Sequence, residues 1–400
     1  MSTRKPLSSR SVVMVILIIA PQIFSFAFAL DIYVPSIPII KEYFNASQIS
    51  VQLTVSLFLL MTGLGQLFMG PLSDQIGRRK IVLTSIIIFI IGSIICTVAN
   101  NIEVLIIGRI VQAFGACGMM VSAFAMVRDL FDGDDCAKIY SFLNSTIALS
   151  PLVAPVIGGY LEVWINWRAS FAVLAILSCL ILASALLNIN ETLPSERRNK
   201  ISRGLLKQYV TVLKSRTFLI YTFCAAAGFA GFLTFFSSSS YIIISLLKIP
   251  VDHFGFYFAA IGIVFFIGSF ISGYCAKRFR TYTTVAIGAV LMAISGLVML
   301  YWYYSFGLTI WGFMGPMMIM GIGGAMLMGG GAGGAIEPFG EMAGTASAVF
   351  GSFEFVFAFI VSTVVLEWKV ESTIPLAITL LVFGLIAVIL CLFNQKVMRR

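Results

Sequence analysis

The stretch Gly70-Pro71-Leu72-Ser73-Asp74-Gln75-Ile76-Gly77-Arg78-Arg79-Lys80 lies between two long apolar runs, at 48–70 and 81–99. Its three adjacent cations suit a short loop at a membrane surface, where Lys and Arg are enriched on the cytoplasmic side. That enrichment does not account for an acid, two glycines and a proline beside them. Glycine permits a tight turn, and the acid offers a partner for a cation. We therefore expect a tight, charge-paired turn between two membrane helices, with a plain basic loop as the alternative.

The composition indicates that lipid surrounds most of this chain. Hydrophobic residues make up 60% and charged residues 11%, with a mean hydropathy of +1.02, whereas soluble domains are about 25% charged. A helix needs about 20 apolar residues to cross the bilayer core. The sequence predicts an all-α polytopic membrane protein with twelve such helices, at 12–40, 48–70, 81–99, 102–126, 137–162, 169–189, 217–246, 254–275, 282–304, 307–335, 342–366 and 373–393.

A charged segment divides the apolar runs into two sets of six. The segment from Asn190 to Arg216 holds nine charged residues and Pro194. We expect an N-terminal six-helix bundle at 1–189, a cytoplasmic linker at 190–216 and a C-terminal six-helix bundle at 217–400.

The positions of Lys and Arg predict that both termini are cytoplasmic. When alternate loops are assigned to opposite sides, one side carries 21 cations and the other 4, with Arg109 inside a run; cytoplasmic loops carry such an excess. The basic start and the apolar run that ends in Ala27-Phe28-Ala29 also resemble a secretory signal. We favour a first membrane helix, because the run is longer than a signal core and continues to Asp31.

Several classes of function lack the residues they need. The seven cysteines are scattered without paired spacing, and His253 is the only histidine. No phosphate-binding loop with its lysine is present. We expect no enzymatic activity, no metal or other cofactor and no nucleic-acid partner, so an ion gradient must supply the energy for any transport.

The loop at 70–80 resembles the signature of the major facilitator superfamily, G-x-L-x-D-x-x-G-R-[RK], at every specified position. The string from Gly108 to Ala116 resembles the proton-coupling motif of drug antiporters, and that from Ser150 to Gly159 their antiporter motif. Residues 30–38 and 51–56 are similar to the bicyclomycin and chloramphenicol resistance (Bcr/CflA) branch of drug:proton antiporters. Two departures are Ala154, where the antiporter motif prefers glycine, and a degenerate second-half counterpart of the loop at 273–278.

This resemblance implies the major facilitator fold in a bacterial inner membrane and a functional monomer. It implies multidrug efflux, in which small organic compounds are exported by rocking alternating access in exchange for protons. Alternatives are an exporter of an endogenous metabolite such as a siderophore or a sugar, an importer, and a non-transporting membrane receptor of the same fold.

Three ionisable residues lie inside predicted spans, where a charge is costly unless it is paired or hydrated. At 1.5 Å per residue, Asp31 and Arg109 lie about 13 Å and about 10 Å from the same face. Similar depth permits an ion pair, direct or through water, that protonation of Asp31 would break; a static structural pair is the alternative. Glu354 lies near the middle of its span, where burial favours its neutral form. We expect these three residues to take part in proton coupling.

The remaining site residues fall into three groups. The resemblance implies a cytoplasmic gate in which Asp74 and Arg128 form a charge network; solvated loop charges are the alternative. The gating residues are Gly70, Asp74, Gly77, Arg78, Arg79 and Arg128, the antiporter-motif residues are Pro151, Pro155, Gly158 and Gly159, and the expected substrate-cavity residues are Tyr33, Gln52, Gln112, Phe232 and Phe236. The aromatic residues could instead face lipid. We assign no role to Glu337 and Glu341.

Overall fold

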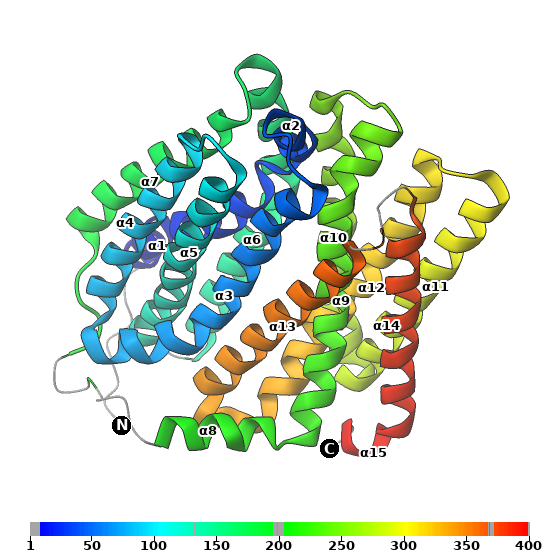
Figure 1. Cartoon of the computed structure of the whole chain (residues 1–400). Coiled ribbons are helices and arrows are strands. Elements are labelled where there is room, and N and C mark those ends of the chain that lie inside the picture. The colour runs from blue at the N-terminus through cyan, green and yellow to red at the C-terminus, as the bar shows by residue number, and fades with distance from the viewer. Residues whose placement is uncertain are drawn as a thin grey trace.

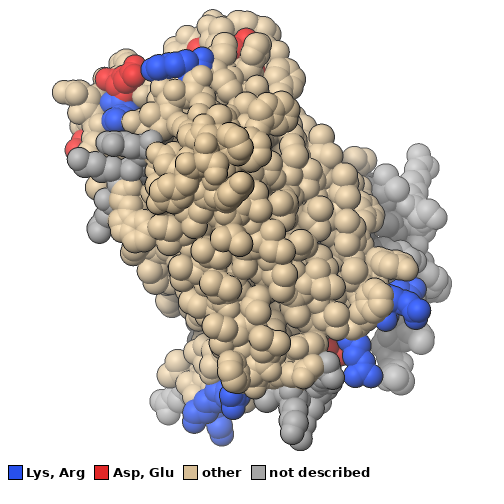
Figure 2. Space-filling model, turned by 90° about the vertical axis from the view of Figure 1, so that its right-hand side faces the viewer, with Lys and Arg blue, Asp and Glu red and all other residues tan. Residues whose placement is uncertain are grey.

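Long apolar helices make up this protein. The computed structural model describes residues 9–131, 133–194, 198, 204–366, 368 and 372–398. Within these residues, twelve helices are long and apolar enough to cross a membrane, which confirms the predicted fold class. Figure 1 shows them packed side by side, and on the face seen in Figure 2 the Lys, Arg, Asp and Glu side chains gather at the two ends. The belt between them suits the bilayer core.

The first six spans are built from eight helical elements. They are α1 (Ser9–Asp31), η1 (Val34–Ser36) and α2 (Ile37–Tyr43), which together form span one, then α3 (Gln48–Ile76), α4 (Arg78–Thr97), α5 (Ile102–Leu130), α6 (Gly133–Trp164) and α7 (Arg168–Asn188).

The second half contains the other six long helices and four short helical elements. Its elements are α8 (Gly204–Leu213), α9 (Arg216–Ser240) with the π-helix η3 (Tyr241–Leu246), α10 (Val251–Phe279), α11 (Thr281–Phe306), α12 (Ile310–Ile336) with η4 (Glu337–Met342), α13 (Ala343–Leu366), α14 (Ile374–Phe393) and α15 (Gln395–Met398). Helix α8 lies in the segment that we expected to be a linker, and the sequence analysis did not foresee it.

The helices pack in two groups, which meet along two helix pairs. Helices α1 and α3–α7 form one group, and α9–α14 form the other. Between the groups, α6 packs against α10 and α3 packs against α13. At one end of the molecule lie the turn between α3 and α4, α8 and α15 (Figure 1). We call this the basic end, and the other the opposite end.

Two helix boundaries differ from the simple apolar runs. Helix α3 continues through Pro71 to Ile76, and α4 begins at Arg78, so the expected loop is reduced to Gly77. This residue has φ +110° and ψ 148°, a conformation that side chains disfavour. The first span is broken after Asp31, where two turn residues and the η1 helix interrupt it.

Candidate functional site

Asp31 lies at the break in the first span, with its side chain buried. The residue is 3% exposed, and its Oδ2 accepts a hydrogen bond of 2.7 Å from the Ser150 hydroxyl of α6. Helix α6 is also the helix that packs against α10 of the second group. The carboxyl group is therefore one hydrogen bond away from the contact between the two groups.

Arg109 is fully buried in α5 and is held by backbone and aromatic groups. Its Nε donates to the Thr54 carbonyl at 3.1 Å, and its Nη1 donates to the Ala29 carbonyl at 3.0 Å. The guanidinium lies 4.5 Å from the Tyr33 ring centroid and 4.2 Å from that of Phe58. These contacts replace part of the hydration that a buried cation loses. Its Nη2 is buried and has no hydrogen-bond partner among the described residues.

Among the described residues, Asp31 and Arg109 do not form a direct ion pair. Arg109 binds the α1 backbone at Ala29, two residues before Asp31, while Asp31 turns to Ser150 on α6. Sequence spacing gave the two residues a common depth, but depth does not fix the direction in which a side chain leaves its helix. The guanidinium and the carboxyl group therefore lie at the same part of α1 but have different hydrogen-bond partners.

Gln112 and Tyr33 position Arg109. The Gln112 carbonyl accepts from Arg109 Nη1 at 2.6 Å, and its amide donates to the Ser93 hydroxyl at 2.8 Å. The Tyr33 hydroxyl lies 3.0 Å from Thr54 Oγ1, and its ring lies against the guanidinium. Both were expected to line the substrate cavity, but their polar groups form hydrogen bonds within the first helix group.

Glu354 lies near the middle of α13 and is partly exposed. It makes no hydrogen bond or ion pair with any residue that the structure describes, in contrast to Asp31. Its neighbour Phe355 makes edge-on ring contacts with Phe26 at 6.1 Å and with Phe229 at 5.1 Å. The carboxyl group therefore adjoins the region where α13 packs against α3 and α9.

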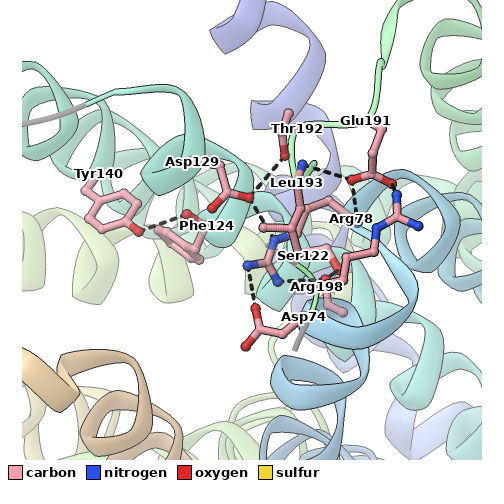
Figure 3. A network of polar contacts seen from close by, with 11 residues as sticks. Asp74, Arg78, Ser122, Phe124, Asp129, Tyr140, Glu191, Thr192, Leu193 and Arg198 are labelled. Carbon is pink, nitrogen blue, oxygen red and sulfur yellow. Dashed lines mark hydrogen bonds and ion pairs between the residues drawn. The ribbon is translucent and has the colours of Figure 1, made fainter. Parts of the chain in front are cut away.

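Arg78 is the centre of a polar network at the basic end (Figure 3). Its side chain is 3% exposed and bonds to Asp74 Oδ1 at 2.5 Å, Asp129 Oδ2 at 2.9 Å and Ser73 Oγ at 3.1 Å. Asp129 Oδ2 also accepts from the Thr192 hydroxyl at 3.1 Å. One guanidinium thus joins the ends of α3 and α5 to the segment after α7.

Glu191 closes this network over the turn at Gly77. Its Oε1 accepts the backbone N–H of Arg78 at 2.9 Å, and its Oε2 lies 3.3 Å from Arg198 Nη2. A carboxylate is favoured at this position because the first N–H groups of a helix lack intrahelical partners. A Cβ at Gly77 would collide with Glu191 Oε2. Glycine is thus required here both by φ and by space.

The other expected gating residues occupy different positions. Arg79 Nε donates to the Ile189 carbonyl at 2.7 Å, at the end of α7, where a cation favours the helix terminus. Arg128 is exposed on α5 and does not pair with Asp74 in the described part of the chain. Its guanidinium lies against Gly344 of α13, where an added Cβ would be 2.7 Å from Nη1. A Cβ at Gly70 would meet only Val121, at 4.0 Å, so this conformation gives no steric reason for glycine there.

The antiporter-motif residues shape the α6 surface that faces α1 and α10. Pro151 and Pro155 lie inside α6, and each removes an intrahelical hydrogen bond. A Cβ at Gly158 would collide with the Ile32 carbonyl oxygen, and one at Gly159 would lie 2.8 Å from the Val251 carbonyl oxygen. Both glycines therefore allow close backbone contact, one with the broken first span and one with α10.

Gln52 joins the two helix groups at the opposite end. Its Nε2 donates to the Ser237 carbonyl of α9 at 2.6 Å, just before the π-helix η3. The N–H of Tyr241 bonds to the Ser238 carbonyl, three residues back, and not to that of Ser237. Gln52 therefore serves a helix carbonyl at an irregular turn, and such irregular turns are frequent at functional sites. We expected this residue to line the substrate cavity.

Phe232 and Phe236 belong to an aromatic cluster within the second helix group. Phe232 packs edge-on against Phe265 with ring centroids 5.0 Å apart, and Phe236 lies 4.7 Å from Phe258. Phe232 is buried, so it does not face lipid. Glu337 is exposed in η4, and the side chain of Glu341 lies outside the described residues.

Three important residues were missed as site residues by the sequence analysis. Ser150 begins the antiporter-like string and binds Asp31, Asp129 follows the predicted gating residue Arg128, and Glu191 opens the linker. The last two stood in sequence as ordinary charges at helix ends. No local signal in the sequence connects them with Arg78, because these pairings depend on tertiary contact.

Comparison with known proteins gives one family over most of the chain. The family model described as Major Facilitator Superfamily matches residues 19–362. The chain is 31% identical to Multidrug resistance protein D of Escherichia coli over 82% of each chain. It is 30% identical to a Chloramphenicol resistance protein of Pseudomonas aeruginosa, over 84% of this chain and 79% of that one. It is 28% identical to a Bicyclomycin resistance protein homolog of Haemophilus influenzae, over 88% and 89%.

A solved structure supports the fold independently of close sequence similarity. A POT family transporter in complex with 5-aminolevulinic acid superposes with a TM-score of 0.76, at 13% identity, over 97% of this chain and 96% of that one. At this identity the likeness concerns the fold alone.

Proposed function

The chain belongs to the Major Facilitator Superfamily and is a multi-pass membrane transporter of small molecules, and from this premise we propose that it exports drug-like organic compounds in exchange for protons. The names of its relatives, which include multidrug, chloramphenicol and bicyclomycin resistance proteins, support the substrate class. The excess of cations in the loops on one side of the sequence, the side that includes Arg78, Arg79 and Lys80, supports a cytoplasmic location for the basic end and for both termini, in the inner membrane of a bacterium.

The observation that carries the proton-coupling proposal is the Asp31–Ser150 hydrogen bond. An ionisable group in a membrane span is a candidate for proton transfer. Asp31 becomes neutral when it binds a proton, and this changes the hydrogen bond that it accepts from Ser150 of α6. Because α6 packs against α10, the change acts on the contact about which the two helix groups would rock.

Arg109 supplies the fixed charge in this proposal. Among the residues that the structure describes, one donor of its buried guanidinium, Nη2, has no partner, and the guanidinium binds α1 two residues before Asp31. Either an ionised Asp31 or a polar group of the substrate could accept a hydrogen bond from that donor. A proton on Asp31 and a bound substrate would therefore compete for the same region. Proton entry gains about 2.3 kcal/mol per 100 mV of membrane potential, which is sufficient to drive export. No cofactor is required, and one chain contains all the parts.

The direct test is transport in proteoliposomes with an imposed pH gradient. Substrates from a panel of antibiotics and secreted metabolites are loaded, and their flux is measured with and without the gradient. We expect Asp31→Asn to fold normally and to lose the response of flux to the gradient, whereas Glu103→Gln, which removes an exposed carboxylate on α5, retains it. Gradient-driven flux that survives in Asp31→Asn would refute the coupling role.

Arg109→Ala tests the fixed charge separately. We expect flux to fall to background in Arg109→Ala. The matched variant Arg168→Ala should keep the response to the gradient, because Arg168 is the first residue of α7 and binds the Ala99 carbonyl, away from Asp31 and Arg109. Normal flux in Arg109→Ala would contradict the competition between proton and substrate. A response only to secreted metabolites would identify an endogenous product as the substrate.

A further inference from the structure

Helix α8 exposes a stripe of apolar side chains that no other part of the described chain covers. Leu206 is 72% exposed, Val210 42% and Leu213 43%. Their spacing of four and three residues puts them on one face of the helix. At an aqueous surface this stripe would be left in contact with water, which is unfavourable for apolar side chains.

The other faces of α8 have distinct surroundings. Tyr209 and Val212 lie about a quarter turn from the stripe, at 3.6 residues per turn, and Val212 is fully buried against the helix groups. Lys207 and Lys214 lie about a quarter turn away on the opposite side and are exposed. The helix therefore presents protein-facing, apolar and basic faces in that order around its axis. This is the pattern of a helix that lies in a membrane surface.

The height of α8 agrees with such a position. The Tyr209 hydroxyl donates to the Leu67 carbonyl of α3 at 2.9 Å. Leu67 lies nine residues before the end of α3, about 13 Å along the axis. The next residue, Phe68, is an apolar side chain that is 66% exposed. Helix α8 thus runs across the basic end (Figure 1) and is hydrogen-bonded to α3 next to an exposed apolar side chain.

Tyr209 is well suited to hold this position. Burial, together with the nearby Asp74 carboxylate, raises the pKa of the Tyr209 hydroxyl. The hydroxyl therefore stays protonated and remains a donor at neutral pH. The preceding residue, Gln208, accepts a hydrogen bond of 3.1 Å at its side-chain carbonyl from the Thr345 hydroxyl of α13. Helix α8 consequently contacts both helix groups, where α3 and α13 pack together.

We propose that α8 binds the anionic phospholipid headgroups of the leaflet at the basic end, with Leu206, Val210 and Leu213 inserted at the boundary with the acyl chains. The basic face matches the negative charge of such a leaflet, and α8 is hydrogen-bonded to α3 next to its exposed Phe68. A protein partner would have to cover a stripe that lies beside a membrane span, so the bilayer is the occupant that the position favours. The leaflet charge then acts on a helix that bridges α3 and α13.

The test uses the full chain and hydrogen–deuterium exchange of residues 204–213. Exchange is measured in detergent micelles, in phosphatidylcholine vesicles, and in vesicles made of equal parts of phosphatidylcholine and phosphatidylglycerol. The anionic vesicles should slow exchange relative to phosphatidylcholine by about 25-fold, because each of two lysines gains about fivefold from an anionic surface. Inorganic phosphate added to micelles should not reproduce this effect, because it supplies the headgroup charge without a bilayer.

Two sets of variants separate the charged and apolar faces. Lys207→Gln with Lys214→Gln should remove the difference between the two kinds of vesicle. Leu206→Ser with Val210→Ser and Leu213→Ser should remove the protection given by any vesicle. As a matched control, Lys277→Gln with Arg278→Gln removes the same charge from the end of α10 and should leave the protection of α8 unchanged.

The outcomes that overturn the proposal are distinct. Equal exchange in both kinds of vesicle would exclude recognition of anionic headgroups. Equal protection in vesicles and in micelles would assign the stripe to a protein contact. Protection by phosphate in micelles would indicate a small-anion site. Exchange in α9, measured in the same samples, reports whether each variant has kept its fold.

Discussion

Replacement of Gly77 by alanine tests the physical account of the turn between α3 and α4. With φ +110° and ψ 148°, an alanine here would be strained by about 1–3 kcal/mol. Its Cβ would also displace the Glu191 carboxylate, which binds the Arg78 N–H at 2.9 Å. A hydrogen bond to a charged group is worth about 1.5–3 kcal/mol. We therefore expect Gly77→Ala to lower the free energy of unfolding by roughly 3–5 kcal/mol.

The assay is equilibrium unfolding in mixed micelles with increasing SDS. Gly273→Ala is the matched control, because a Cβ at that helical glycine meets no atom within 4 Å, and alanine there should stabilise by up to about 1 kcal/mol. In a Glu191→Ala background, Gly77→Ala should cost only the backbone strain. If Gly77→Ala behaves like the control, or costs as much without Glu191 as with it, the account of this turn is wrong.

Further expectations concern the two ends of the molecule. Arg78→Lys should destabilise by about 2–3 kcal/mol in the same unfolding assay, since one ammonium cannot reproduce three separately directed bonds; a loss below that of the exposed Lys80→Gln would speak against it. Gln52→Leu should loosen closure at the opposite end, and raise labelling of a cysteine placed at Lys41 in a cysteine-free background by about fivefold, as expected for one lost hydrogen bond; unchanged labelling would show that this bond does not hold the end closed. Arg79→Gln should cost about 0.5–1 kcal/mol, because the α7 terminus loses its cation, and the same assay checks it.

The irregular parts of the fold were less predictable than its spans. The break after Asp31 and the π-helix at Tyr241 both follow ordinary apolar sequence. Helix α8 lay in a segment whose many charges suggested only a linker. Its Tyr209 is satisfied by the Leu67 carbonyl from another helix, 142 residues away. Such segments take their form from contacts, which local composition does not contain.

The sequence by itself determined the twelve spans, their apolar surface and the turn at Gly77. Bilayer thickness sets the length of every apolar run, and the conformation of a one-residue turn selects glycine. The tertiary structure alone decided the partners of the buried charges. Asp31 binds Ser150, Arg109 binds backbone carbonyls and Gln112, and Asp74 pairs with Arg78, where we had expected a network with Arg128. The physical reason is that helical spacing fixes how deep a side chain lies, whereas the rotation and packing of the helices decide which group it meets.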